Sequence, residues 1–292
     1  MTEIENETTA VIPAENESWD HILPTLESLR KQTVVLAKVI FVDDASPTPL
    51  TPPVSDSKLM VIRNEKNLGI SGSRNHGAEV ANTEFVLFIN CGITLPPTWH
   101  EVVRSHMQAH PKAGLASTRV VSNRPDDLMT RWRFRFLENP FTWTRQTRKV
   151  PWLMGHVVIA RRRILLEIGG YDQDLRVSQE DGDICQRLNE AGYEVWQVDG
   201  PDGVSYETNT LELMAKKAIR NRGWSLSKEA YPGRDLRTFD ARGALKDQNA
   251  FLVSGVLRNL GKGRIRLALA SVAIWLRARK LILEADRQPP GR

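Results

Sequence analysis

The chain has 292 residues, of which 41% are hydrophobic and 26% are charged, as is ordinary for a globular protein with a buried core. Its two cysteines are too few for a disulfide framework or a metal knuckle. The first nine residues are polar and acidic, unlike a secretory signal, and no uncharged apolar run reaches the roughly 18 residues of a membrane span. We therefore expect a cytoplasmic protein that does not cross a bilayer.

Strands and helices alternate in the first part of the chain. Apolar runs predict strands over 9–13, 38–43, 59–62 and 85–89, and amphipathic segments predict helices over 19–30 and 70–80. Strands that are apolar throughout are covered on both faces, as in a parallel sheet between layers of helices. The alternation predicts an α/β fold whose ligands bind at the carboxyl ends of the strands.

An acidic cluster marks a helix start further along the chain. Glu180, Asp181 and Asp183 precede apolar residues at helical spacing, Gly192 is placed to end the helix, and 193–198 is predicted as the next strand. Free backbone N–H groups at a helix start favour carboxylates. The cluster is therefore expected in a cleft, although helix capping alone would explain Glu180 and Asp183.

Several segments of the chain, which follow one another in the order typical of the family, resemble family 2 glycosyltransferases of the GT-A fold. In the first half they are 11–16, 42–46 and 67–75. In the second half the matching residues are Arg163, Gly169, Gly170, Tyr171, Asp172, Glu180, Asp181, Gly192 and Tyr193. The resemblance covers about residues 8–210 and implies a Rossmann-like mixed sheet between helices, within a domain at 1–210. Its nucleotide-binding half is expected at about 8–118 and its acceptor half at about 119–210.

The resemblance implies roles for individual residues. Asp181 is implied as the general base, which takes the proton of a sugar hydroxyl as that hydroxyl attacks. Asp43, Asp44 and Arg74 are implied to hold a nucleotide-sugar, because carboxylates accept from base or ribose and Arg donates to phosphate. Turn chemistry alone would also explain the Asp pair. Further residues expected at the donor are Pro13, Glu15, Asn90 and Gly92, and those expected near the acceptor are Trp152, Gly155, His156 and Glu180.

The sequence departs from the family pattern where a metal site is expected. The family normally carries Asp-x-Asp after the fourth strand, to hold Mg²⁺ or Mn²⁺, and this chain has Asn90, Cys91 and Gly92 there. A His that many relatives place later is also missing, and Glu207 is a weak substitute for it. Because these cations prefer anionic oxygen ligands, the sequence predicts a weak metal site or none.

Two classes of function follow. An active, inverting transferase would use protein cations in place of the metal. Residues 119–149 contain eight Lys or Arg, three acidic residues and interleaved aromatics, and are interpreted as a charged lid. A catalytically degenerate nucleotide-sugar binder or scaffold is the alternative, and we favour the enzyme because the Glu180–Asp181 context is intact. Nucleic acid binding through the aromatics of 131–136 is a minor interpretation, since these alternating residues also suit one face of a strand.

Residues 211–292 are predicted as a basic, helical appendage, with helices over 211–224 and 251–285. Residues 248–283 contain seven Lys or Arg and no acidic residue. Such a helix suits an anionic membrane surface, where each Lys or Arg adds about 1 kcal/mol, or it packs with a solvated basic edge. In the first case the protein is peripheral on the inner face of the membrane and its acceptor is a lipid-linked sugar. A glycan acceptor is the other expectation.

Overall fold

The computed structural model describes residues 7–52, 56–137, 145–226, 237 and 239–287. The chain forms two compact units, one of residues 1–123 and 139–206, the other of residues 124–138 and 207–292. This division differs from the boundary at residue 210 that the sequence suggests, because 124–138 belongs to the C-terminal unit and not to the acceptor half. The reason is packing, since Trp132 is fully buried in the core of the second unit.

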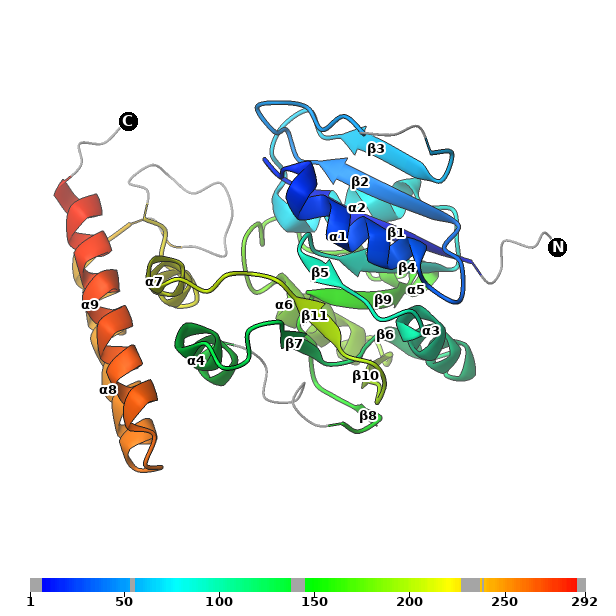
Figure 1. Ribbon diagram of the computed structural model, residues 1–292. Coiled ribbons are helices and arrows are strands. Elements are labelled where there is room, and N and C mark those ends of the chain that lie inside the picture. Colours follow the sequence, from blue (N-terminus) through cyan, green and yellow to red (C-terminus); the bar gives the residue numbers. More distant parts are fainter. Residues whose placement is uncertain (1–6, 53–55, 138–144, 227–236, 238, 288–292) are drawn as a thin grey trace. The chain divides into compact units, whose positions relative to one another are not determined.

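The first unit contains a mixed β-sheet flanked by helices (Figure 1). Its strands, in order across the sheet, are β3 (Leu59–Arg63), β2 (Lys38–Asp43), β1 (Thr8–Ala14), β4 (Phe85–Ile89), β9 (Val157–Arg161), β6 (Ala113–Ser117), β10 (Glu194–Gln197) and β8 (Arg148–Lys149). The first four are parallel to one another, as are β6 and β10, whereas β9 is antiparallel to both of its neighbours and β8 is antiparallel to β10. The predicted α/β class with a mixed sheet is confirmed.

Helices cover both faces of this sheet. They are α1 (Trp19–Arg30), α2 (Gly69–Val80), α3 (Trp99–Ala109), α5 (Arg162–Glu167) and α6 (Glu180–Glu190), and a small second sheet has the order β5 (Ile93–Thr94), β11 (Gly203–Ser205) and β7 (Val120–Ser122). Phe85 and Leu87 of β4 join one apolar core with residues of α1 and α3. Val86 and Phe88 join another with residues of α2, α5 and α6. The continuous apolar strand therefore lies between two helix layers, as predicted.

The described part of the second unit is helical, with α4 (Leu128–Phe136), α7 (Leu211–Arg220), α8 (Ala241–Leu260) and α9 (Ile265–Arg287). Trp132 of α4 donates a hydrogen bond to Ser271 of α9 (3.0 Å), and its ring packs against Phe136 and Phe251. The aromatics of this segment therefore lie on a helix and not on a strand, and Trp132 is not exposed for base stacking. The remainder of the predicted lid includes residues 138–144, which lie outside the described residues.

The helix predicted over 251–285 is wrong in two respects, because α8 already begins at Ala241 and because the chain turns within the predicted range. α8 ends at Leu260 and α9 begins at Ile265, and Gly263 between them has a φ of 66°, in the left-handed region that favours glycine. Trp275 donates to Asn249 (2.9 Å), so α8 and α9 run antiparallel as a hairpin. In the described part of the chain, no helix is long and apolar enough to span a membrane.

Candidate active site

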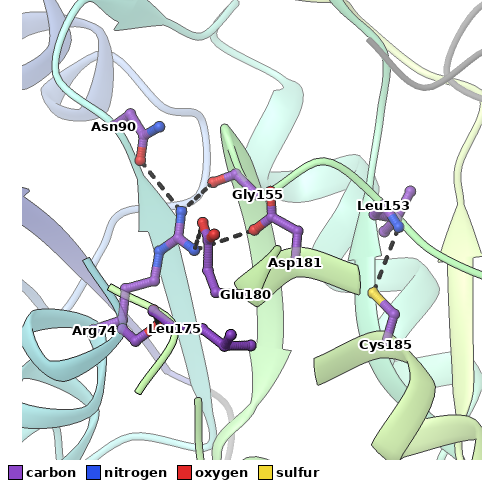
Figure 2. A network of polar contacts seen from close by, with 9 residues as sticks. Arg74, Asn90, Leu153, Gly155, Leu175, Glu180, Asp181 and Cys185 are labelled. Atoms are coloured by element: carbon purple, nitrogen blue, oxygen red, sulfur yellow. Dashed lines mark hydrogen bonds and ion pairs between the residues drawn. The ribbon is translucent and has the colours of Figure 1, made fainter. Parts of the chain in front are cut away.

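A buried guanidinium connects four segments of the first unit (Figure 2). Arg74, on α2, is 1% exposed. Its Nη1 donates to Oε1 of Glu180 (3.3 Å) and to Oδ1 of Asp181 (3.2 Å). Its Nη2 donates to the carbonyl oxygen of Gly155 (2.7 Å) and to Oδ1 of Asn90 (3.4 Å). With α2, the network joins the end of β4, the segment before β9 and the start of α6, where Asp181 lies.

The start of α6 places both carboxylates. Gln179 precedes the helix with a φ of 69°, a left-handed conformation that costs energy in a residue other than glycine. Glu180, Asp181 and Asp183 fill the first turn, where the helix dipole favours negative charge. Asp183 pairs with Arg187 one turn further on (2.7 Å), whereas Glu180 contacts Arg74. Glu180 therefore belongs to the site, and Asp183 to the helix surface.

Gly155 provides the space that this network needs. A Cβ atom added to Gly155 would lie 2.0 Å from Oδ1 of Asp181 and 2.9 Å from Nη2 of Arg74. Both distances are shorter than a real Cβ contact, so any larger residue would displace the carboxylate or the guanidinium. Gly155, which the sequence places near the acceptor, lies against the carboxylate itself.

Burial and charge shape the protonation of the cluster. Burial raises the pKa of Glu180, the neighbouring Asp181 raises it further, and Arg74 opposes both effects. One guanidinium charge faces two carboxyl groups, so the cluster is balanced when one of them is protonated. The Glu180 side chain is 8% exposed and that of Asp181 is 19% exposed. Burial therefore favours the proton on Glu180, and of the two side chains that of Asp181 is the more open to solvent.

Replacing Glu180 with Gln is expected to remove part of the pH dependence of stability. The pKa of Glu180 is raised from 4.5 to about 8, so the folded state binds this proton more tightly than the unfolded state. The resulting stabilisation is present below pH 4.5 and is lost as the pH rises through about 8, at up to about 1.4 kcal/mol per pH unit. Urea denaturation at several pH values measures it, with Glu190→Gln, exposed at the other end of α6, as control. Identical slopes for Glu180→Gln and wild type would contradict the assignment.

The side chain of Asp43, at the end of β2, is buried and bonded within the protein. It accepts from the backbone N–H groups of Ser46 (3.0 Å) and Leu50 (3.1 Å) and from Arg63. Burial would raise the pKa of Asp43, but these hydrogen bonds outweigh it and lower the pKa. The turn chemistry weighed in the sequence analysis is therefore present, and binding of the donor by Asp43 stays a prediction.

Asp44 is engaged in the same way with the loop that enters α2. It accepts from Asn64 Nδ2 (2.7 Å) and from the backbone N–H groups of Leu68 and Gly69 (2.8 Å each). Asn64 also donates to Ser73 (3.0 Å), the neighbour of Arg74 in the sequence. A carboxylate has about four acceptor positions, so three such bonds leave about one for a ligand.

A polar cluster beside Asp44 includes residues that the sequence analysis did not assign. Asn67 Nδ2 donates to Oε1 of Glu15 (2.8 Å), and Arg176 Nη2 donates to Oδ1 of Asn67 (2.7 Å). Burial and the charge of Asp44 raise the pKa of Glu15, whereas the charge of Arg176 lowers it. Arg176 lies in the spacer before the Glu-Asp pair, where it is the one basic residue of the sequence 171–180. That feature of the sequence could have indicated a role for Arg176 in the site.

The residues at the Asp-x-Asp position do not fit a divalent metal. Asn90 Oδ1 faces Arg74, and burial raises the pKa of the Cys91 thiol to about 12, so Cys91 offers no thiolate. Gly92 has a φ of 74°, and an added Cβ would lie 2.4 Å from Nε2 of His21. Among the described residues, no three His, Cys, Asp or Glu side chains are grouped to hold an ion.

Glu207, the weak substitute ligand, is held by cations of the second unit. Its Oε1 accepts from Nζ of Lys217 (2.6 Å), and its Oε2 accepts from Arg133. Arg133 is 3% exposed and also donates to Asn209 (3.2 Å). Glu207 is therefore the counterion of Lys217 and Arg133. Arg133, which belongs to the predicted lid, lies in a buried network and not at a free surface.

The other predicted residues occupy the edge of the sheet or its core. Pro13 lies in β1 opposite Val42 of β2. The carbonyl oxygen of His156 accepts from the backbone N–H of Asn90 (3.0 Å), which brings the segment before β9 to the end of β4. Trp152 is partly buried against the core on the α2 and α6 side.

Comparison with known proteins identifies relatives of this chain. The model of the family described as "Glycosyl transferase family 2" matches residues 9–169. Pre-mycofactocin glycosyltransferase of Mycobacterium tuberculosis is 26% identical over 283 residues, covering 91% of this chain and 55% of that protein. Glucosyl-dolichyl phosphate glucuronosyltransferase of Haloferax volcanii is 26% identical over 196 residues, covering 60% of each. The chain thus spans less than two thirds of the length of these relatives.

Solved structures share the fold at low sequence identity. A crystal structure of GalNAc-T7 with UDP, GalNAc and Mn²⁺ has a TM-score of 0.56 at 16% identity, over 76% of this chain and 49% of that one. The structure of S. aureus TarS has a TM-score of 0.54 at 16% identity, over 95% of this chain and 55% of that one. The predicted GT-A fold is confirmed. Since the family model matches more than half of its residues, the chain belongs to glycosyl transferase family 2.

Proposed function

We propose that this chain transfers a sugar from a nucleotide-sugar to an acceptor hydroxyl with inversion at the anomeric carbon, and that Asp181 is the general base. The observation that carries the proposal is the carboxylate of Asp181, partly exposed and fixed by the buried Arg74 at the start of α6. A hydroxyl is a poor nucleophile at neutral pH, and a fixed carboxylate within hydrogen-bond reach takes its proton during attack.

The reaction is a single displacement. The acceptor oxygen forms a bond to the anomeric carbon, the bond from that carbon to the diphosphate breaks on the opposite side, and the hydroxyl proton passes to Asp181. Arg74 acts as a positioning residue, because it holds Oδ1 of Asp181 and the Gly155 carbonyl at the same time. When Glu180 is protonated it is neutral, so the positive charge of Arg74 is balanced by the carboxylate of Asp181 alone.

We propose that the donor lies at the carboxyl ends of β1, β2 and β4. Glu15 and Asp44 lie together there, and Asp44 keeps about one free acceptor position. Because the Asn90 to Gly92 segment does not fit a metal, protein groups are proposed to stabilise the leaving diphosphate. The candidates are His21, which lies beside Gly92, and Arg176, which lies beside Asn67.

The two relatives act on different acceptors by name, pre-mycofactocin in one case and glucosyl-dolichyl phosphate in the other. We propose a hydroxyl-bearing glycan or lipid-linked sugar as the acceptor of this chain. The lipid-linked class gains support from the membrane surface argued below.

Removal of divalent metal is expected to leave donor binding intact. Calorimetric titration with UDP-, GDP- and dTDP-sugars, once with EDTA and once with Mn²⁺, tests this, followed by turnover of the tightest binder. Equal affinity in both conditions is the expected result, since the Asn90 to Gly92 segment offers neutral groups only. Loss of binding on chelation would contradict stabilisation by protein groups. Absence of binding in every condition would favour the degenerate scaffold.

A further inference from the structure

The end of the α8–α9 hairpin combines exposed apolar and exposed basic side chains. We call residues 257–269 the hairpin tip. Its exposed apolar residues are Leu257 (64% exposed), Leu260 (50%), Ile265 (63%) and Leu269 (63%). Its exposed basic residues are Arg258, Lys262, Arg264 and Arg266. Monomeric proteins usually expose large apolar side chains singly, so four of them on either side of one turn point to an interaction surface.

Backbone hydrogen bonds and buried side chains close the turn at the hairpin tip. The backbone N–H groups of Lys262 (3.1 Å) and Arg264 (2.8 Å) donate to the carbonyl oxygen of Asn259, and Asn259 Nδ2 donates to that of Gly255 (2.9 Å). Leu267 points into the buried core of the unit. The exposed leucines and Ile265 are therefore not needed to close the turn.

The basic residues of the tip lie in a stretch of sequence without acidic residues. Residues 248–283 contain no Asp or Glu. Within the described part of the chain, none of the four basic side chains of the tip forms an ion pair. Further along α9, Arg277 pairs with Glu212 and Glu284, and Lys280 lies 3.8 Å from Glu284. The positive charge is thus concentrated at the tip and partly neutralised along α9.

We infer that the hairpin tip docks on an anionic bilayer surface, with its apolar side chains in the interfacial layer and its cations at the headgroups. Interfacial binding needs this pairing of apolar and basic groups, and each Lys or Arg near such a surface strengthens binding by about fivefold. A two-fold contact with a second copy would oppose four cations to four cations. The inference does not depend on the transfer reaction proposed above.

Co-sedimentation of the full chain with lipid vesicles at low salt tests the inference. The vesicles are phosphatidylcholine alone or phosphatidylcholine mixed with phosphatidylglycerol. The charge variant is Arg258→Gln/Lys262→Gln/Arg264→Gln/Arg266→Gln, and the apolar variant is Leu260→Ser/Ile265→Ser. The matched control is Arg279→Gln/Lys280→Gln, which removes exposed charges of α9 outside the tip.

We expect wild type to bind the anionic vesicles and not the neutral ones. The charge variant is expected to lose binding by a few hundredfold and the apolar variant by at least about tenfold, with at most a few-fold change in the control. Melting temperature and donor binding should stay unchanged in all three, which separates this test from that of the reaction. If the charge variant does not fold, its two halves, Arg258→Gln/Lys262→Gln and Arg264→Gln/Arg266→Gln, carry the test, with about 25-fold expected for each.

The inference is overturned if the wild type does not bind the anionic vesicles, and three further results would also overturn it. One is undiminished vesicle binding by the charge or apolar variant. Another is an equal loss per charge in the control, which would indicate attraction by net charge alone. The third is a dimer in sedimentation velocity that Leu260→Ser/Ile265→Ser dissociates, since a second copy would then cover the tip.

Discussion

Asp181→Asn is expected to lower the rate of sugar transfer by about 10²- to 10⁴-fold, the range attributed to general base catalysis. Asn has nearly the same size, and its amide oxygen still accepts from Arg74, but it does not take a proton from the acceptor. Donor affinity should therefore stay as in wild type. Release of the nucleoside diphosphate measures the rate, and calorimetry measures the affinity.

The control is Asp183→Asn, on the same turn of α6. Asp183 pairs with Arg187 at 2.7 Å and takes no part in the Arg74 network, so its loss should leave transfer nearly unchanged. Normal turnover by Asp181→Asn would place the base elsewhere. Equal losses in the two variants would point to damage of the helix start instead of a lost base.

Arg74→Met is expected to destabilise the fold by about 3–5 kcal/mol, as when one partner of a buried ion pair is removed. Met occupies a similar volume but leaves Asp181 and Glu180 side by side without a cation. Urea denaturation at neutral pH measures the loss. Adding Asp181→Asn to this variant should recover part of it, because the uncompensated charge is then gone.

Arg63→Met provides the comparison for this prediction. Arg63 also bonds a buried carboxylate, that of Asp43, but its own side chain is 40% exposed. Solvent screens such a pair, so we expect a loss of no more than about 1 kcal/mol. If Arg74→Met cost as little as Arg63→Met, the buried network would not be a source of stability.

Features that depend on neighbouring residues were predictable from the sequence. The α/β alternation, the double-sided burial of β4 and the helix start at Glu180 follow from local apolar spacing and turn residues, and the structure confirms them. The position of Asp181 at that helix start follows from the same local pattern, because the acidic cluster, the helix and Gly192 follow one another within a few turns. Its role as general base was implied by the family resemblance alone and stays a prediction.

The partners of Arg74 were not predictable in this way. Its contacts with Glu180 and Asp181 span 106 and 107 residues of the chain, so no local pattern reports them. The resemblance assigned Arg74 to the donor phosphate, whereas the structure gives it protein acceptors. Asp43 and Asp44 show the same limit, since backbone N–H groups and one side chain each already occupy about three of their four acceptor positions.

The hairpin shows a different limit. The apolar spacing of α8 continues into α9, so periodicity alone joined two helices into one over 251–285. The left-handed Gly263 and the backbone bonds to Asn259 make the turn. The glycines at 261 and 263 indicate this turn in the sequence, but the prediction followed the apolar periodicity instead.

The most direct test of the central claim is the anomeric configuration of the transferred sugar, followed by NMR for wild type, Asp181→Asn and Asp183→Asn. A single displacement with Asp181 as base predicts inverted product from wild type and from Asp183→Asn, and almost none from Asp181→Asn. Product with retained configuration, or inverted product formed at the wild-type rate by Asp181→Asn, would contradict it.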